Sequence, residues 1–147
     1  MWPTLADDLQ ELVRNEPSVT TRKSLVDARI GQGEFRCNVL QQWGNTCAVT
    51  AASTLEVIRA SHIKPWCESL NEERLDPFNG LPLIATIDAL FDAGLISFDA
   101  NGTMLISPRL SGTERGVLGI HNLSLRKPPH SKTVAYLEYH RSEKYQA

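Results

Sequence analysis

The sequence lacks the features of membrane-spanning and secreted proteins. Its 147 residues contain no apolar run near the ~18 residues that a helix needs to cross a bilayer. The opening residues have no basic start followed by an apolar stretch, so we expect no secretory signal. These absences predict a cytoplasmic protein with no membrane partner.

Cysteine is also scarce. The three cysteines, Cys37, Cys47 and Cys67, form no closely spaced pair of the kind that supplies the ligands of a structural zinc. An odd number of widely spaced cysteines favours reduced thiols, and we expect most of them to be buried.

Charge is nearly balanced overall but uneven along the chain. The formal net charge is −2, yet residues 107–147 carry a net +4 and the remainder carries −6. Residues 65–100 contain a single basic residue, Arg74. An acidic centre can hold a divalent cation and a basic flank can hold a polyanion, although solvated surface is the alternative explanation for both.

Hydrophobic spacing predicts several helices in one mixed α+β domain. Residues 18–33 contain Gly31 and Gly33 and are expected to form a polar connector with room for one helical turn. The helices are expected over residues 5–14, over residues 35–43 with an end at Gly44-Asn45, from Ala85 or Thr86 to Gly94, and over residues 132–145.

Short strands are expected between these helices. Residues 46–50 are β-prone, and a short strand should follow Asn79-Gly80. Residues 55–63 fit either a strand or a helix, and a strand or an extended turn is expected at their end, over residues 60–63. Residues 95–98 and 103–106 flank Asn101-Gly102, which is a strong signal for a β-hairpin.

Four residues combine the side-chain types that phosphodiester hydrolysis requires. His62 ends a predicted strand, Asn79 opens a turn 17 residues later, and Asp88 and Asp92 lie four residues apart on one predicted helical face. A neutral imidazole can accept a proton from water, and paired carboxylates suit Mg²⁺ or Mn²⁺. On residue type alone, a structural histidine, a turn asparagine and two solvated acids are the commoner explanation of the pattern.

Three longer segments sharpen this interpretation. The segments ASHIKPW at 60–66, RLDPFNGL at 74–81 and LFDAGLISF at 90–98, in this order, resemble the HNH endonucleases, and the nearest subgroup is the one found in bacterial restriction systems. Residues 29–36 and 47–50 add to the resemblance, which extends from about residue 21 to residue 145.

The resemblance implies a ββα-metal core in which two short strands, a loop and a helix surround one cation. We therefore expect an α+β fold with that core, flanking N-terminal and C-terminal helices and a small β-hairpin. The expected division is an N-terminal helix and connector over residues 1–30 and the nuclease domain over residues 31–147.

The resemblance also implies a metal-dependent DNA endonuclease, expected to act in restriction or defence. His62 matches the general base, Asn79 the residue that braces the loop, and Asp88 and Asp92 the metal ligands of the helix. Asp88 stands where the family has its second histidine, which favours Mg²⁺ or Mn²⁺ over Zn²⁺. Ser61 stands where many relatives have aspartate or histidine.

DNA is the partner that the resemblance implies. Lys64, Arg126 and Lys127 are candidate contacts to the DNA backbone. A homodimer is a reasonable expectation because duplex cleavage often needs two sites, and a restriction-system partner subunit is left open. The alternative is an HNH-fold module that binds DNA or a protein with weak or no cleavage, which the substitutions at Ser61 and Asp88 favour.

Overall fold

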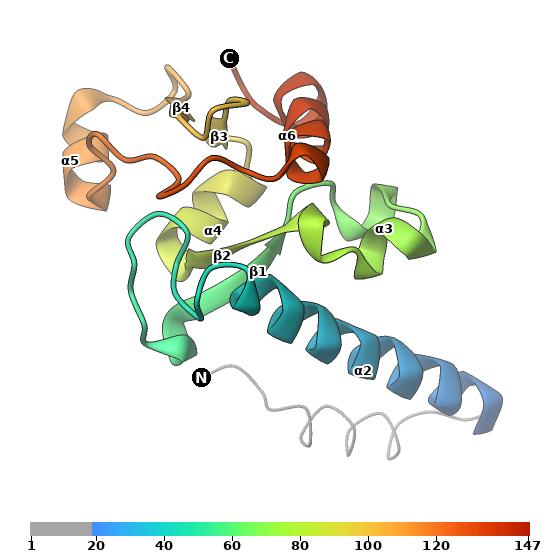
Figure 1. The fold of residues 1–147 in the computed structure, drawn as a ribbon. Helices are drawn as coiled ribbons and strands as arrows, with labels where there is room; N and C mark the ends of the chain where they lie inside the picture. The colour runs from blue at the N-terminus through green and yellow to red at the C-terminus, as the bar shows by residue number, and fades with distance from the viewer. Residues whose placement is uncertain (1–18) are drawn as a thin grey trace.

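A long helix, α2 (Val19–Gln41), begins the part of the chain that the computed structural model describes, residues 19–147 (Figure 1). The connector expected over residues 18–33 is therefore wrong, and the expected boundary between residues 30 and 31 falls inside a continuous helix. The helix expected over residues 5–14 lies outside the described residues.

The glycines of α2 do not interrupt it. Gly31 and Gly33 each cost about 1 kcal/mol relative to alanine in a helix interior. The C-terminal half of the helix offsets this cost because Phe35, Val39 and Leu40 are buried. Tertiary packing thus outweighs local propensity, and the helix ends as expected near Gly44, which has a φ of 64°. No helix within residues 19–147 is long and apolar enough to cross a membrane.

The central element is an antiparallel hairpin of β1 (Ile58–His62) and β2 (Gly80–Ile84). Its register pairs Ile58 with Ile84 at one end and His62 with Gly80 at the other. Helix α4 (Ala85–Asp92) follows β2 without a connecting loop and completes the expected ββα unit. Figure 1 shows the hairpin between α2 and α4.

Strand alternation assigns the two faces of the hairpin to different helices. A β-carbon built on Gly80 would meet side chains of α2, so Gly80 and its partner His62 face α2. Ser61, the next residue back, faces the opposite side and lies beside Asp88 of α4. The imidazole and the α4 carboxylates therefore lie on opposite faces of β1.

A second hairpin follows α4, as expected. Strands β3 (Ile96–Phe98) and β4 (Met104–Ile106) pair across the turn that contains Gly102, whose φ is 89°. The carboxylate of Asp99 accepts the backbone N–H groups of Asn101 and Thr103 at 2.9 Å each, which fixes the turn.

The C-terminal region covers the second hairpin. Helix α6 (Ser131–Glu143), which was expected, buries Leu137 and His140 against the core. Helix α5 (Gly112–Leu118) was not expected, because two of its seven residues are glycine. Its Val117 is exposed. Residues 46–50 form a turn instead of the expected strand, and Ala48 donates its backbone N–H to Pro82 of β2.

The cysteines differ from expectation in burial. Cys47 is buried in the core, whereas Cys37 and Cys67 are exposed. Cys37 lies on a solvent-facing position of α2 and Cys67 lies in the 3-10 turn η2 (Trp66–Glu68), so neither position requires an apolar side chain.

His140 is a fully satisfied polar group within the core. Its Nε2–H donates to the carbonyl of Phe91 at 2.9 Å, and its Nδ1 accepts from the hydroxyl of Ser97 at 2.8 Å. The ring also stacks on Phe91, with centroids 3.9 Å apart. Burial lowers the pKa of His140, since the charged imidazolium would lose solvation there.

We expect this histidine to make the protein less stable as the pH falls. The unfolded chain takes up a proton near pH 6.5, before the folded state does, so the free energy of unfolding decreases as the pH falls below about 6.5. Thermal unfolding between pH 7.5 and 5.5 should show this slope, and His140→Gln should reduce it without abolishing it, because burial also lowers the pKa of His62. His121→Gln, at an exposed position, is the control and should keep the parent slope. An unchanged slope in His140→Gln would contradict the assignment.

Candidate active site

His62 lies at the end of β1 with its ring held on three sides. Its Nε2 is 2.9 Å from the carbonyl oxygen of Arg74. The ring stacks on Phe35 with centroids 4.0 Å apart and planes at 4°, and Trp66 approaches it edge-on at 5.8 Å. Because a carbonyl only accepts hydrogen bonds, Nε2 carries the proton and Nδ1 is the acceptor nitrogen of the neutral ring.

The environment of His62 favours that neutral ring. Burial lowers the pKa of the imidazole, and the hydrogen bond to Arg74 raises it by a smaller amount. The ring is nevertheless only half-buried, so solvent reaches part of it. A neutral imidazole with a fixed tautomer is the form that a general base requires near pH 7.

Asn79 holds the loop between β1 and β2. The residue is fully buried, and its Oδ1 accepts the backbone N–H of Lys64 at 2.8 Å. Its Nδ2 donates to the carbonyl of Glu73 at 3.0 Å and to that of Lys64 at 3.3 Å. Since Glu73 directly precedes Arg74, this amide fixes the segment that supplies the carbonyl partner of His62.

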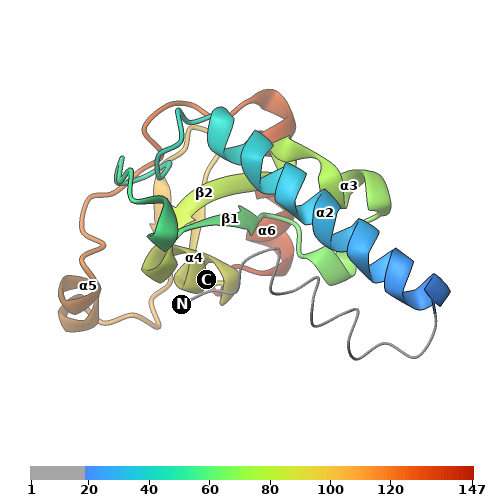
Figure 2. The same ribbon diagram turned by 90° about the horizontal axis from the view of Figure 1, so that it is seen from below.

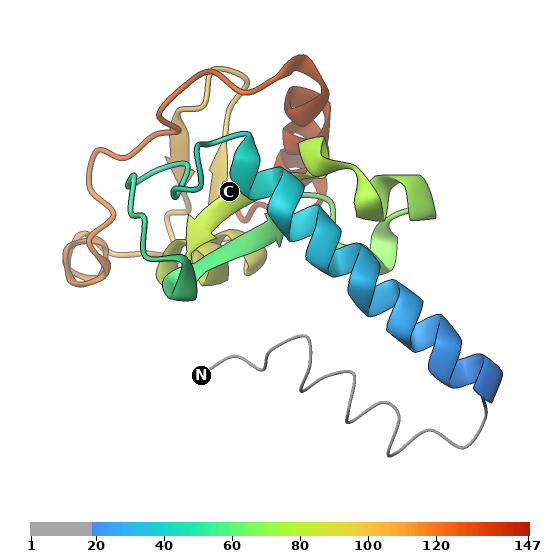
Figure 3. The same ribbon diagram turned by 60° about the horizontal axis from the view of Figure 1, so that its bottom comes forward.

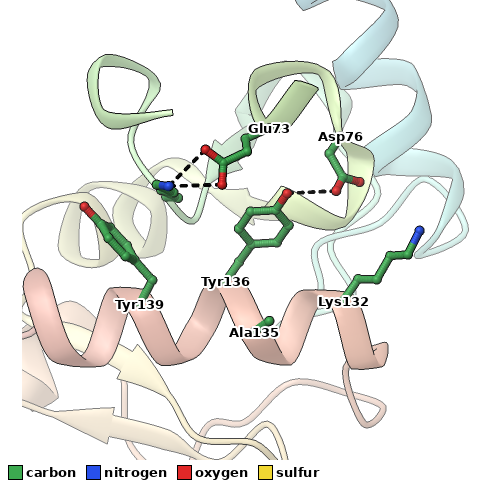
Figure 4. Close-up of a pocket in the computed structure, with 7 residues that line it drawn as sticks. Glu73, Asp76, Lys132, Ala135, Tyr136 and Tyr139 are labelled. Atoms are coloured by element: carbon green, nitrogen blue, oxygen red, sulfur yellow. Dashed lines mark hydrogen bonds and ion pairs between the residues drawn. The ribbon is translucent and has the colours of Figure 1, made fainter. Parts of the chain in front are cut away.

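The same loop is supported by α6. Thr133 donates its hydroxyl to the carbonyl of Phe78, and Tyr136 donates its own to Asp76 at 2.9 Å. Figure 4 shows Tyr136 and Tyr139 on α6 facing the loop across a pocket of about 360 Å³. Burial and the bond to Asp76 raise the pKa of Tyr136, which keeps the phenol protonated as a donor.

Lys64 does not extend freely from this loop. Its ammonium forms an ion pair with Glu73 at 2.9 Å and lies 5.0 Å from the ring centroid of Tyr139. The pair is partly exposed, so it contributes at most a modest stabilisation. Contact of Lys64 with DNA stays a prediction.

Asp88 and Asp92 lie one turn apart on α4. Asp88 is half-buried and Asp92 is exposed. Burial is the main cause that raises the pKa of Asp88; repulsion from Asp92 adds to it, and a hydrogen bond from Ser61 and the charge of Arg59 oppose it. Within residues 19–147, no group of three or more His, Cys, Asp and Glu side chains is arranged to hold a metal ion.

Arg126 and Lys127 contact the turn that follows α2. Arg126 donates to the carbonyls of Cys47 at 3.0 Å and Trp43 at 3.4 Å, and Lys127 donates to that of Gln42. Both cations also lie over the ring of Trp43, at 5.9 and 4.6 Å from its centroid. These contacts satisfy backbone carbonyls of the turn that follows α2. A role of either side chain in DNA binding stays a prediction.

Two partners of His62 have no clear signal in the sequence. The carbonyl of Arg74 belongs to the backbone, so no residue type marks it. Phe35 follows the helical spacing of an ordinary core residue and lies 27 positions before the histidine, so only the folded structure shows the stack.

A comparison with protein families identifies the region around the hairpin. The model of the HNH endonuclease family matches residues 47–99, and no curated protein matches the chain. The matched segment contains β1, β2 and α4, and with them His62, Asn79, Asp88 and Asp92. The ββα segment at residues 47–99 is therefore similar to the HNH endonucleases.

Proposed function

We propose that this protein is a metal-dependent DNA endonuclease in which His62 is the general base. The observation that carries the proposal is the 2.9 Å contact between Nε2 of His62 and the carbonyl of Arg74. This contact leaves Nδ1 as the nitrogen that can accept a proton from the attacking water. The match of residues 47–99 to the HNH endonuclease family supports nuclease activity and DNA as the substrate.

In this proposal, His62, the carbonyl of Arg74 and Asn79 each have a separate role in the reaction. Nδ1 of His62 takes the proton of the water that attacks the phosphorus, and the carbonyl of Arg74 stabilises the imidazolium that forms. Asn79 keeps this carbonyl in place through its bond to the preceding residue, Glu73. The oxygen that leaves the phosphorus remains on the other DNA fragment, so one P–O bond forms and one breaks.

Asp88 and Asp92 are the residues that would hold a divalent cation. Their carboxylates repel each other and Asp88 is half-buried, so a bound cation would offset both penalties. Two hard oxygen donors suit Mg²⁺ or Mn²⁺, which keep several water ligands. When bound, the cation would stabilise the charge on the phosphate and on the leaving oxygen. Because the imidazole and these carboxylates project from opposite faces of β1, one phosphate could meet both only around the end of the strand, where His62 lies.

A cleavage assay across metals tests the activity. Supercoiled plasmid should be nicked in Mg²⁺ or Mn²⁺ and left intact in EDTA. Methylated and unmethylated plasmids should be compared, since a difference between them would support a role in restriction. Plasmid that stays intact in Mg²⁺, Mn²⁺, Co²⁺ and Ni²⁺ would overturn the proposal.

We expect Asp88→Asn to weaken the affinity for the metal by about tenfold or more, since even the loss of residues that only support metal ligands costs about 10–100-fold in affinity. The change should raise the Mg²⁺ concentration needed for half-maximal cleavage, and excess Mg²⁺ should restore part of the rate. Asp27→Asn, at an exposed position of α2, is the matched control and should behave as the parent. Equal metal titrations for Asp88→Asn and the parent would exclude Asp88 as a ligand.

A non-cleaving module is the second candidate, and one observation favours it. Asp88 already has a protein partner in Ser61, at the strand position where many relatives carry an acidic or imidazole group. Binding of DNA without cleavage in all four metals would select this candidate over the nuclease.

A further inference from the structure

Helix α2 lies outside the matched segment and yet forms one wall of the site. The matched segment covers residues 47–99, whereas α2 ends at Gln41. Figures 2 and 3 show this helix running across the hairpin. Its Phe35 is buried and stacks on the His62 ring, with centroids 4.0 Å apart and planes at 4°.

The hairpin leaves room for this contact at one position. Gly80 pairs with His62, and a β-carbon built on Gly80 would lie 2.6 Å from Cζ of Phe35 and 2.6 Å from Cγ2 of Val39. Any side chain there would push the phenyl ring out of its place. The absence of a side chain at Gly80 thus leaves the room that Phe35 needs to stack on His62.

A side chain of α2 and one just after its end also tie the helix to the hairpin and its loop. Arg36, the residue after Phe35, donates to the carbonyls of Ile58 at 2.6 Å and Leu55 at 3.0 Å. One turn and a half further on, Gln42 donates to the carbonyl of Pro77 at 2.8 Å. These bonds set the depth and the rotation of α2 relative to β1, and therefore the position of Phe35.

We propose that Phe35, on α2, is a positioning residue for His62. This inference rests on the proposed nuclease function. A flat ring parallel to the imidazole restricts rotation of that ring, so Nε2 stays on the carbonyl of Arg74 and Nδ1 keeps its direction. Rate depends steeply on such placement, because an error of about 1 Å can cost about 100-fold.

The charged groups of the surrounding elements have partners of their own. On α2, Arg36 is bound to carbonyls of β1 and of the segment before it. In the loop, Arg74 donates to the carbonyl of Trp66, and Lys64 pairs with Glu73. A change at Phe35 therefore alters packing and solvent access at His62 and removes no charge.

The test compares Phe35→Leu with Val39→Ala. Val39 is buried one turn further along α2 and faces the same glycine, so its truncation is a matched loss of packing that removes no ring from the stack with His62. Cleavage is measured at pH 8, where His62 is neutral in every variant. We expect Phe35→Leu to lower kcat by about 10–100-fold with KM for DNA unchanged, and Val39→Ala to keep the parent kcat.

An NMR titration of the His62 ring gives a readout independent of cleavage. Solvent should reach the ring once the phenyl group is gone, so the pKa of His62 should rise toward about 6.5 in Phe35→Leu and stay at the parent value in Val39→Ala. Phe35→Met, whose flexible side chain fills a similar space, replaces the leucine variant if that variant does not fold.

The outcomes separate the two proposals. If kcat and the His62 titration of the Phe35 variant match those of Val39→Ala, the positioning role is wrong. If the parent protein cuts no DNA, the nuclease proposal fails, and with it the role of Phe35 in catalysis; the titration then reports only on packing. Loss of kcat together with the shifted titration, in the Phe35 variant alone, supports the inference.

Discussion

We expect His62→Ala to lower plasmid cleavage by about 10²–10⁴-fold, the usual contribution of a general base. The attacking water then has no acceptor for its proton. Metal binding should persist, because Asp88 and Asp92 lie on α4, on the other face of β1. A nicking assay in saturating Mg²⁺ measures the loss, and a metal titration shows that the cation site is unaffected.

The variant should still fold. The substitution removes a half-buried ring and one hydrogen bond to Arg74, which costs about 1–3 kcal/mol, and a domain of this size commonly has more stability than that. The circular dichroism spectrum at 25 °C should therefore match that of the parent. His121→Ala, at an exposed position of the chain, is the matched control and should cut at the parent rate.

The pH profile provides a second signature of the same residue. Because burial lowers the pKa of His62, kcat/KM of the parent should rise with pH and reach its half-maximum below about pH 6.5. The residual activity of His62→Ala should lack that acidic limb. A variant that cuts as fast as the parent, or that keeps the limb, would show that another group accepts the proton.

The parts of the fold that follow from sequence are those with local signals. The hairpin turn at Asn101-Gly102 and the end of α4 at Gly94 are set by glycines whose φ values are 89° and 73°. The core helix α4 follows from its apolar spacing. Such features depend on neighbouring residues, so the pattern of a short window specifies them.

Helix α2 shows why other parts do not follow. Gly31 and Gly33 are typical of a connector, yet the helix continues through both because residues further along it are buried against the hairpin. That burial involves strands that begin at Ile58, after the helix has ended. A local window contains the cost of the glycines and not the packing that offsets it.

The candidate site divides in the same way. The resemblance singles out His62 and Asn79, but the partners that surround them come from the fold. No residue type identifies the backbone carbonyl of Arg74 as a partner of His62. Phe35 has the pattern of an ordinary core residue, and only the structure shows that it stacks on His62. What sequence predicts is the chemistry of the side chains; what the structure adds is the tautomer and the orientation that this chemistry needs.

We expect Asn79→Asp to be the most destabilising single-atom exchange in the loop. The change replaces the Nδ2 donor with an oxygen that would face the carbonyls of Glu73 and Lys64, in a fully buried position. Leaving these acceptors unpaired and burying a carboxylate costs about 3–5 kcal/mol. For a chain of 147 residues this corresponds to a fall in Tm of roughly 6–20 °C, which differential scanning calorimetry measures directly.

Activity should fall further than the loss of folded protein explains. The amide of Asn79 binds the carbonyl of Glu73, and the next residue, Arg74, supplies the carbonyl that holds His62. Loosening this segment would therefore leave the tautomer and orientation of the imidazole unfixed. Below the Tm of the variant, kcat per folded molecule should therefore drop while KM for DNA changes little. Asn101→Asp, the same exchange at an exposed turn position, is the matched control and should leave both Tm and kcat near the parent values. Parent-like kcat in folded Asn79→Asp would mean that the loop holds His62 without this amide, and that the asparagine serves the fold alone.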